Sequence, residues 1–158
     1  MKIAHRDVDI ATDGADAIPS LTSFDRVIVL MPSLDGLGTH LTDLMSWVSA
    51  GGSLMLGMTP DNSNYLQAIA SKLGIESAGY DYAKAESIVP SEDFMLGGGE
   101  RYEFSDPFDS SLSVSLRDTA HVWAKTGDAG TPLIWSNDCG SGHTVVCNIG
   151  IYDKVMRG

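Results

Sequence analysis

Two short apolar segments, separated by a segment with helical periodicity, constrain the fold of this chain most. Residues 26–31 (RVIVLM) form a continuous apolar run, which is typical of a strand covered on both faces of a sheet. Residues 53–58 (SLMLGM) predict another buried strand. Between them, Thr39 and the pair Gly51–Gly52 mark the expected ends of a helix. The apolar residues of this helix recur at helical spacing: Leu37, Leu41, Leu44, Met45 and Val48. Strand, helix and strand in this order predict a right-handed βαβ unit and a parallel sheet.

A second amphipathic helix is expected directly after the second strand. Asn62 or Ser63 would cap its beginning, and Gly74 would end it. Its apolar face comprises Tyr65, Leu66, Ile69, Ala70 and Leu73. The order of strand, helix, strand and helix at this spacing fits right-handed βαβ units and a parallel sheet.

After the second helix, the sequence no longer shows the alternation of strand and helix patterns. Residues 80–118 lose helical periodicity, and we expect short strands and loops laid over the edge of the sheet. Residues 121–126, 132–137 and 143–150 are alternating or apolar strands, separated by the turn sequences GDAGT and DCGSG. The pattern as a whole predicts a three-layer α/β sandwich with a mainly parallel sheet and a C-terminal antiparallel hairpin.

Composition narrows the class of partner. A length of 158 residues fits one domain, residues 1–158. The net charge of −11 argues against nucleic acid and against an anionic membrane surface. No apolar run reaches the ~18–20 residues of a membrane span, and the first residues do not resemble a signal peptide. The polar beginning and the ending IYDKVMRG predict a fragment of a longer protein, whose compartment the sequence leaves open.

Neither the cysteines nor the histidines predict a metal or cofactor site. Cys139 and Cys147 flank a hairpin turn, and Cys147 would lie about 13 Å along its strand from that turn, which predicts two free thiols. The four histidines lack metal-ligand spacing. The acidic segment DVDIATDGAD fails the calcium-loop pattern, because Gly14 comes too late and Ile18 stands at the twelfth position.

Two stretches resemble the class I glutamine amidotransferase-like superfamily. FDRVIVLMP, a helix and SAGGSLMLGMTPDN are similar to the strands and helix that lead to its nucleophile. TPLIWSNDCGSGHTVVCNIG is similar to the terminal hairpin of its non-catalytic branches, the ThuA-like proteins and the β-galactosidase trimerisation domains. Gly140, Gly142 and the pair Val145–Val146 carry that match. The resemblance implies a flavodoxin-like or class I amidotransferase-like sheet. The ending NIGIYDKVMRG resembles an uncharacterised bacterial family that joins such a domain to a polysaccharide-deacetylase-like barrel.

The catalytic part of the superfamily pattern is absent from this sequence. On the elbow of form G-x-C-x-G, Gly57 matches the first glycine, Thr59 replaces the cysteine and Asp61 replaces the second glycine. Glycines beside the nucleophile relieve crowding at a strained turn, and proline and aspartate do not. No His-Pro pair occurs, so the family's histidine–glutamate pair has no counterpart. We therefore expect no catalytic residue.

A ligand-binding role is the alternative to a turn or helix cap for the residues at this junction. Ligands bind at the carboxyl ends of parallel strands, and free N–H groups at a helix start favour anions or hydroxyl-rich ligands. An acidic residue there disfavours phosphate and is compatible with a sugar. The candidate ligand-binding residues are Thr59, Asp61, Asn62 and Ser63. Trp47, Trp123 and Trp135 could form a sugar-stacking platform if exposed, but we expect Trp123 and Trp135, in neighbouring strands, to pack together in the core.

The sequence therefore predicts a non-catalytic scaffold or interaction domain of a larger, carbohydrate-related bacterial protein. One alternative is a hydrolase or amidotransferase variant with a rebuilt active site, which needs a base near Thr59 or Ser63. A second alternative is a sugar-binding module. The expected partners are other domains of the parent protein or a carbohydrate, without cofactor, nucleic acid or membrane insertion, and an oligomer is compatible with the sequence.

Overall fold

The structure is a computed structural model that describes residues 6–9, 13–31, 34–58, 64–94, 98–127 and 129–149. Its helical elements are the short 3-10 helices η1 (Ala15–Ala17), η2 (Leu21–Ser23), η3 (Leu34–Leu37) and η4 (Ala70–Leu73), and the α-helices α2 (His40–Ser49) and α3 (Asn64–Ile69). Its strands are β1 (Arg26–Met31), β2 (Ser53–Met58), β3 (Ile75–Pro90), β4 (Tyr102–Leu116), β5 (His121–Thr126), β6 (Pro132–Cys139) and β7 (Gly142–Cys147).

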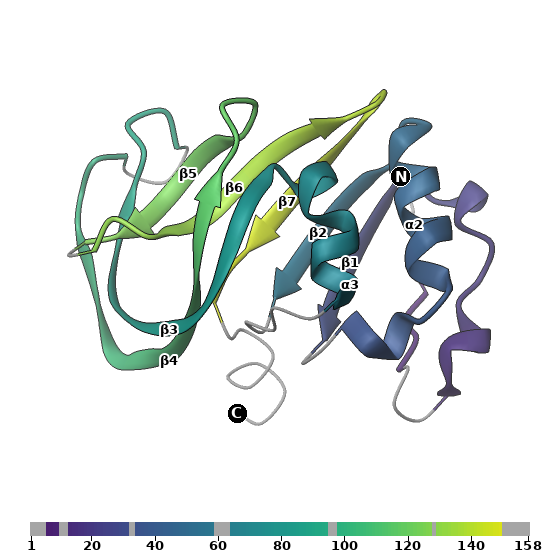
Figure 1. The fold of residues 1–158 in the computed structure, drawn as a ribbon, viewed down its shortest axis with the longest axis horizontal. Helices are drawn as coiled ribbons and strands as arrows, with labels where there is room; N and C mark the ends of the chain where they lie inside the picture. Colours follow the sequence, from purple (N-terminus) through teal and green to yellow (C-terminus); the bar gives the residue numbers. More distant parts are fainter. Residues whose placement is uncertain are drawn as a thin grey trace.

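The strands form one mixed sheet in the order β1-β2-β7-β6-β5-β3-β4 (Figure 1). β1, β2 and β7 run parallel to one another, and every other neighbouring pair is antiparallel. The long β3–β4 hairpin curls its end of the sheet into a half-barrel. The βαβ unit β1–α2–β2 and the β6–β7 hairpin form where the sequence predicted them.

The predicted three-layer sandwich with a mainly parallel, flavodoxin-like or class I amidotransferase-like sheet is wrong. Strands make up 43% of the protein and helices 26%. The alternation of strand and helix stops after η4, because the chain then enters the β3–β4 hairpin instead of another strand–helix unit. The described residues cover the second face of the parallel strands only in part, since Ile28 at the centre of β1 is 65% exposed and Met55 in β2 is partly buried.

The main core lies between the sheet and the helices. Val29, Leu56, Val146 and Trp135 are cross-strand partners in one row over β1, β2, β7 and β6, and all are buried. The helices pack on this face through the apolar stripe that the sequence predicted, and its buried members in α2 are Leu41, Leu44, Met45 and Val48. We call this side of the sheet the helix-facing side.

The helix boundaries follow local sequence signals, with one correction. Gly74 ends η4 in the left-handed conformation (φ 74°), as predicted. α2 ends at Ser49, just before the pair Gly51–Gly52. Thr39 precedes α2, but its backbone is already helical and its side chain makes no capping hydrogen bond.

Residues 80–118 are not the short strands and loops that the sequence predicted. Most of them belong to the β3–β4 hairpin, whose register shifts between Ile75 and Ser77, between Ala78 and Tyr82, and again further along. Each irregularity changes which face successive side chains meet, so the alternation of polar and apolar residues that marks a strand is lost.

The turn between β6 and β7 packs directly on the end of α2. A Cβ atom at Gly142 would lie 2.0 Å from the carbonyl oxygen of Val48, so only glycine fits there. Gly140 adopts φ 65°, a conformation that glycine enters without strain. Between them, the backbone N–H of Ser141 donates to the carbonyl of Ser49 at 3.0 Å. The turn thus caps a helix-end carbonyl that would otherwise lack a partner.

Side chains of the same hairpin satisfy the end of η4. The indole N–H of Trp135 donates to the carbonyl of Leu73 at 2.8 Å, and the amide of Asn137 donates to the carbonyl of Lys72 at 3.0 Å. Both side chains are buried. A buried polar group without a partner costs about 1–3 kcal/mol, so these bonds fix how η4 sits on the sheet.

Asn148, which follows β7, connects three strands. Its buried amide donates to the carbonyl of Leu112 in β4 at 2.8 Å and accepts from the N–H of Leu112 at 2.9 Å. It also donates to the carbonyl of Pro132 at 3.1 Å. Asn148 therefore ties the curled β3–β4 hairpin to β6 and to the end of β7.

Cys147 belongs to a second core cluster with Ala85, Leu133 and Ile149. The cysteines are free thiols, as predicted. Burial raises the pKa of the Cys147 thiol from its usual 9.0 to about 11, because the thiolate would lose its hydration. At neutral pH this sulfur is a packing group.

Gly142→Ala tests the contact between the hairpin turn and α2. The added Cβ atom would overlap the Val48 carbonyl, so we expect a loss of about 3 kcal/mol in the free energy of unfolding, measured by urea denaturation. Gly130→Ala is the matched control, because Gly130 has φ 66° and open space around its Cα; we expect it to cost about 1 kcal/mol. Equal losses in the two variants would contradict the steric argument.

The buried thiol predicts a fall in stability at alkaline pH. Because the pKa of Cys147 is raised in the folded state, its contribution is complete below pH 9 and is lost as the pH rises towards 11, by up to about 3 kcal/mol. The measurement is the free energy of unfolding at pH 8 and at pH 10.5 for the native chain and for Cys147→Ala. We expect a smaller alkaline loss in the variant, and parallel curves would show that Cys147 is not responsible.

Candidate functional site

The carboxyl edge of the parallel strands is where the sequence placed a ligand site. β2 ends at Met58 and α3 begins at Asn64, so the expected strand and helix are both present. The candidate ligand-binding residues lie outside the described residues, and their role stays a prediction: Thr59, Asp61, Asn62 and Ser63. Cys147 and Asn148 leave the sheet at the same edge, and both are buried in structural roles.

Three histidines lie near aspartates on the surface of the protein. His143 Nδ1 is 2.7 Å from Asp138 Oδ1, and His121 Nε2 is 3.1 Å from Asp93 Oδ2. Both of these histidine side chains are at least half exposed. In the part of the chain that the structure describes, no three His, Cys, Asp or Glu residues gather as a metal site.

The third histidine, His40, lies at the carboxyl edge. It is the first residue of α2, which follows β1 and η3, and its Nε2 is 3.7 Å from Asp16 Oδ1. His143 lies at the opposite end of the sheet, because its partner in β2 is Ser53, the first residue of that strand. The register separates His143 from Met58, the last residue of β2, by about 17 Å along the strand direction.

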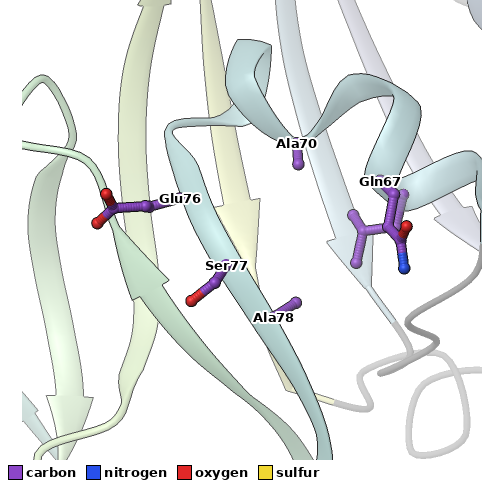
Figure 2. Close-up of a pocket in the computed structure, with 6 residues that line it drawn as sticks. Gln67, Ala70, Glu76, Ser77 and Ala78 are labelled. Atoms are coloured by element: carbon purple, nitrogen blue, oxygen red, sulfur yellow. The ribbon is translucent and has the colours of Figure 1, made fainter.

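A hollow of about 290 Å³ lies between α3, η4 and the beginning of β3. Figure 2 shows Gln67 and Ala70 on the helical side and Glu76, Ser77 and Ala78 on β3. Gln67, Glu76 and Ser77 are exposed, and their polar groups do not converge on one point. Small-molecule sites are deeper and mostly apolar, so this hollow does not meet the requirements for one.

The most unusual surface is the face of the sheet opposite the helices. Ile28, Met55, Val145 and Ser136 are cross-strand partners in one row over β1, β2, β7 and β6, so their side chains share this face. None of the four is fully buried, and Ile28 is 65% exposed. The corresponding helix-facing row is buried throughout. We call the open side, defined by these four residues and Trp123, the outer face.

Trp123 extends the outer face onto β5. Its indole N–H donates to Ser136 Oγ at 2.8 Å, and its ring meets His121 edge-on with ring centroids 4.1 Å apart. The ring centroid of Phe94 lies 6.3 Å from that of Trp123. Trp135 is in the main core, as predicted, but the expectation that the two tryptophans pack together is wrong because they lie on opposite faces.

The outer face suits the burial of apolar surface better than catalysis. Its centre is aliphatic, and the ionisable groups of its row stand at the β5 end, where His121 pairs with Asp93. An uncharged apolar patch on a sheet is typical of contact with another protein surface. Sequence reasoning missed this site, because a continuous apolar strand reads the same whether a helix or a separate partner covers it.

Comparisons with solved structures place the fold within larger enzymes. An exo-β-1,4-mannosidase from an Opitutaceae bacterium shares 25% identity over 90% of this chain, with a TM-score of 0.60. A β-galactosidase from Bacillus circulans shares 18% identity over 84% of this chain, with a TM-score of 0.55. This chain spans only 24% of the first enzyme and 21% of the second.

A smaller protein has the same fold. A cytoplasmic protein of Salmonella typhimurium LT2 shares 13% identity over 83% of this chain and 64% of its own length, with a TM-score of 0.64. At this identity the likeness concerns the fold alone. A comparison with curated proteins gives no match.

No helix in the described ranges is long and apolar enough to cross a membrane. Residues 1–115 match the model of a family described as uncharacterised proteins conserved in bacteria (DUF2194). This match covers more than half of the chain, and the chain therefore belongs to that bacterial family.

Proposed function

We propose that residues 1–158 form a non-catalytic scaffold or interaction domain of a larger, carbohydrate-related bacterial protein, and that the outer face docks on another part of that protein. The observation that carries the proposal is the row from Ile28 through Met55 to Val145, which the described layers of the fold leave incompletely covered. Fully burying one large aliphatic side chain contributes about 1.5–3 kcal/mol, so covering this row would stabilise an assembly.

The comparisons support the setting of this proposal. The chain spans about a quarter of a mannosidase and about a fifth of a β-galactosidase, so the same fold occurs as one part of larger carbohydrate-active chains. The resemblance of the segment with Gly140 and Gly142 to β-galactosidase trimerisation domains agrees with a role in assembly. Fold similarity alone does not give function, and the apolar outer face supplies the physical reason for docking.

A sugar is a poorer candidate for the outer face than a protein surface. Trp123 is half-buried, with His121 and Phe94 beside its ring, and its indole N–H is already bonded to Ser136. The aliphatic side chains of Ile28 and Met55 offer no hydrogen-bonding groups to sugar hydroxyls. A protein partner would bury the whole row.

The proposal predicts protection of the outer face in the parent protein. Hydroxyl-radical footprinting of the isolated chain and of the full-length parent should show Met55 and Trp123 labelled several-fold more slowly in the parent. Tyr65 in α3 is 40% exposed and serves as the internal control, with an unchanged rate. Equal labelling of Met55 in both proteins would overturn the proposed docking.

A hydrolase with a rebuilt site is the second candidate function, and the position of His40 favours it. His40 stands near Asp16 at the carboxyl edge, where β2 ends, and Thr59 and Ser63 come after β2 in the sequence. A nucleophile there requires a base within about 3 Å.

Turnover measurements separate the two candidates. Ester or glutamine turnover that is lost in His40→Ala and in Ser63→Ala, but retained in His143→Ala, would establish the hydrolase. Our leading proposal expects the native chain and all three variants to show the same background rate.

A further inference from the structure

We propose that two copies of this chain pair through the outer edge of β1, antiparallel and related by a two-fold axis, so that the sheet continues from one copy into the other. This inference goes beyond the proposed function, because it concerns the edge of the sheet and a second copy of this chain instead of another part of the parent protein. The occupant of the edge is β1 of a second copy.

Among the strands that the structure describes, β1 is an edge strand with one side unpaired. Its six residues, Arg26–Met31, pair with β2 in unbroken register. In the described part of the chain, no other backbone bonds to β1 along its opposite side, where β1 is the first strand of the sheet. An extended edge with free N–H and C=O groups is a template for another strand.

The two edges of the sheet differ in their protection against pairing. β4, at the far edge, contains Pro107, which has no N–H to donate, and its pairing with β3 shifts register repeatedly. Proline and bulges are the usual devices that block edge-to-edge pairing. β1 has neither device, and Arg26 is its only charged residue. Because β4 carries these blocking features and β1 does not, β1 is the edge at which a second strand can pair.

The sequence of β1 is complementary to itself. Directly opposed residues of an antiparallel pair share one face of the sheet, so residues 28 and 28 can face each other across the two-fold axis. In this register Ile28 meets Ile28 of the second copy, and Val27 meets Val29. Arg26 faces Leu30, which separates the two Arg26 positions by about 13 Å. Outer faces and helix-facing sides then continue across the pair without a mismatch.

Charge and interface size set the conditions under which the pair forms. Each copy carries a net charge of −11, so long-range repulsion opposes association and salt screens it. One pair of short strands buries less than the roughly 800 Å² per partner of a standard interface. We therefore expect a dimer that dissociates on dilution and strengthens with salt.

Sedimentation velocity of the 158-residue chain tests the proposal, from about 5 to about 500 µM at low salt and at about 0.5 M NaCl. We expect reversible dimers that strengthen with salt. Ile28→Lys should raise the dissociation constant by about tenfold or more, because two ammonium groups would meet at the axis. Tyr65→Lys makes the same change at an exposed residue on the helices and should leave association unchanged. A monomer throughout both series, or equal effects of the two variants, would overturn the proposal.

Disulfide trapping tests the register. The native thiols of Cys139 and Cys147 are buried, so a thiol introduced by Ile28→Cys is the accessible one. Under mild oxidation at the highest concentration, we expect this variant to form covalent dimers several-fold faster than Tyr65→Cys. Equal rates would overturn the proposed pairing. Protection of Met55 in the parent protein is a separate readout, so either proposal can fail without the other.

Discussion

A backbone contact between the β6–β7 turn and the end of α2 is the constraint on which the rest of the fold depends. The Val48 carbonyl approaches Gly142 so closely that no side chain fits, and Ser141 caps the carbonyl of Ser49. This contact places β7 parallel beside β2, although the two strands are far apart in sequence. With β7 fixed, β6 and β5 follow as antiparallel neighbours.

The same hairpin supplies the polar groups that hold the other layers. Trp135 and Asn137 satisfy carbonyls at the end of η4, and Asn148 satisfies both backbone groups of Leu112 in β4. These side chains are buried, where each missing bond would be costly. The helices and the curled hairpin are therefore specified by hydrogen bonds to one C-terminal element, as well as by apolar packing.

The sequence predicted the parts of this fold that depend on local patterns. RVIVLM, the helical spacing after it and Gly74 gave the βαβ unit and the end of η4, because periodicity and glycine conformation act within a few residues. The second face of β1 could not be predicted, since Ile28 would look the same under a helix. The β3–β4 hairpin was missed because its register shifts remove the alternation of a regular strand. The ligand-binding role predicted for Asp61 and its neighbours stays a prediction.

The two faces of the sheet differ in how completely the chain itself buries their apolar side chains. On the helix-facing side, Leu56 and Val146 are buried within the chain itself, whereas Met55 and Val145, their neighbours in sequence, face outward under incomplete cover. The open side and the open edge meet at Ile28. A surface docked on the outer face would cover the Ile28 side chain, and a strand added at the edge would bond the backbone of β1. The docked surface would use side chains of the outer face and the added strand would use backbone groups of β1, so one assembly can satisfy both.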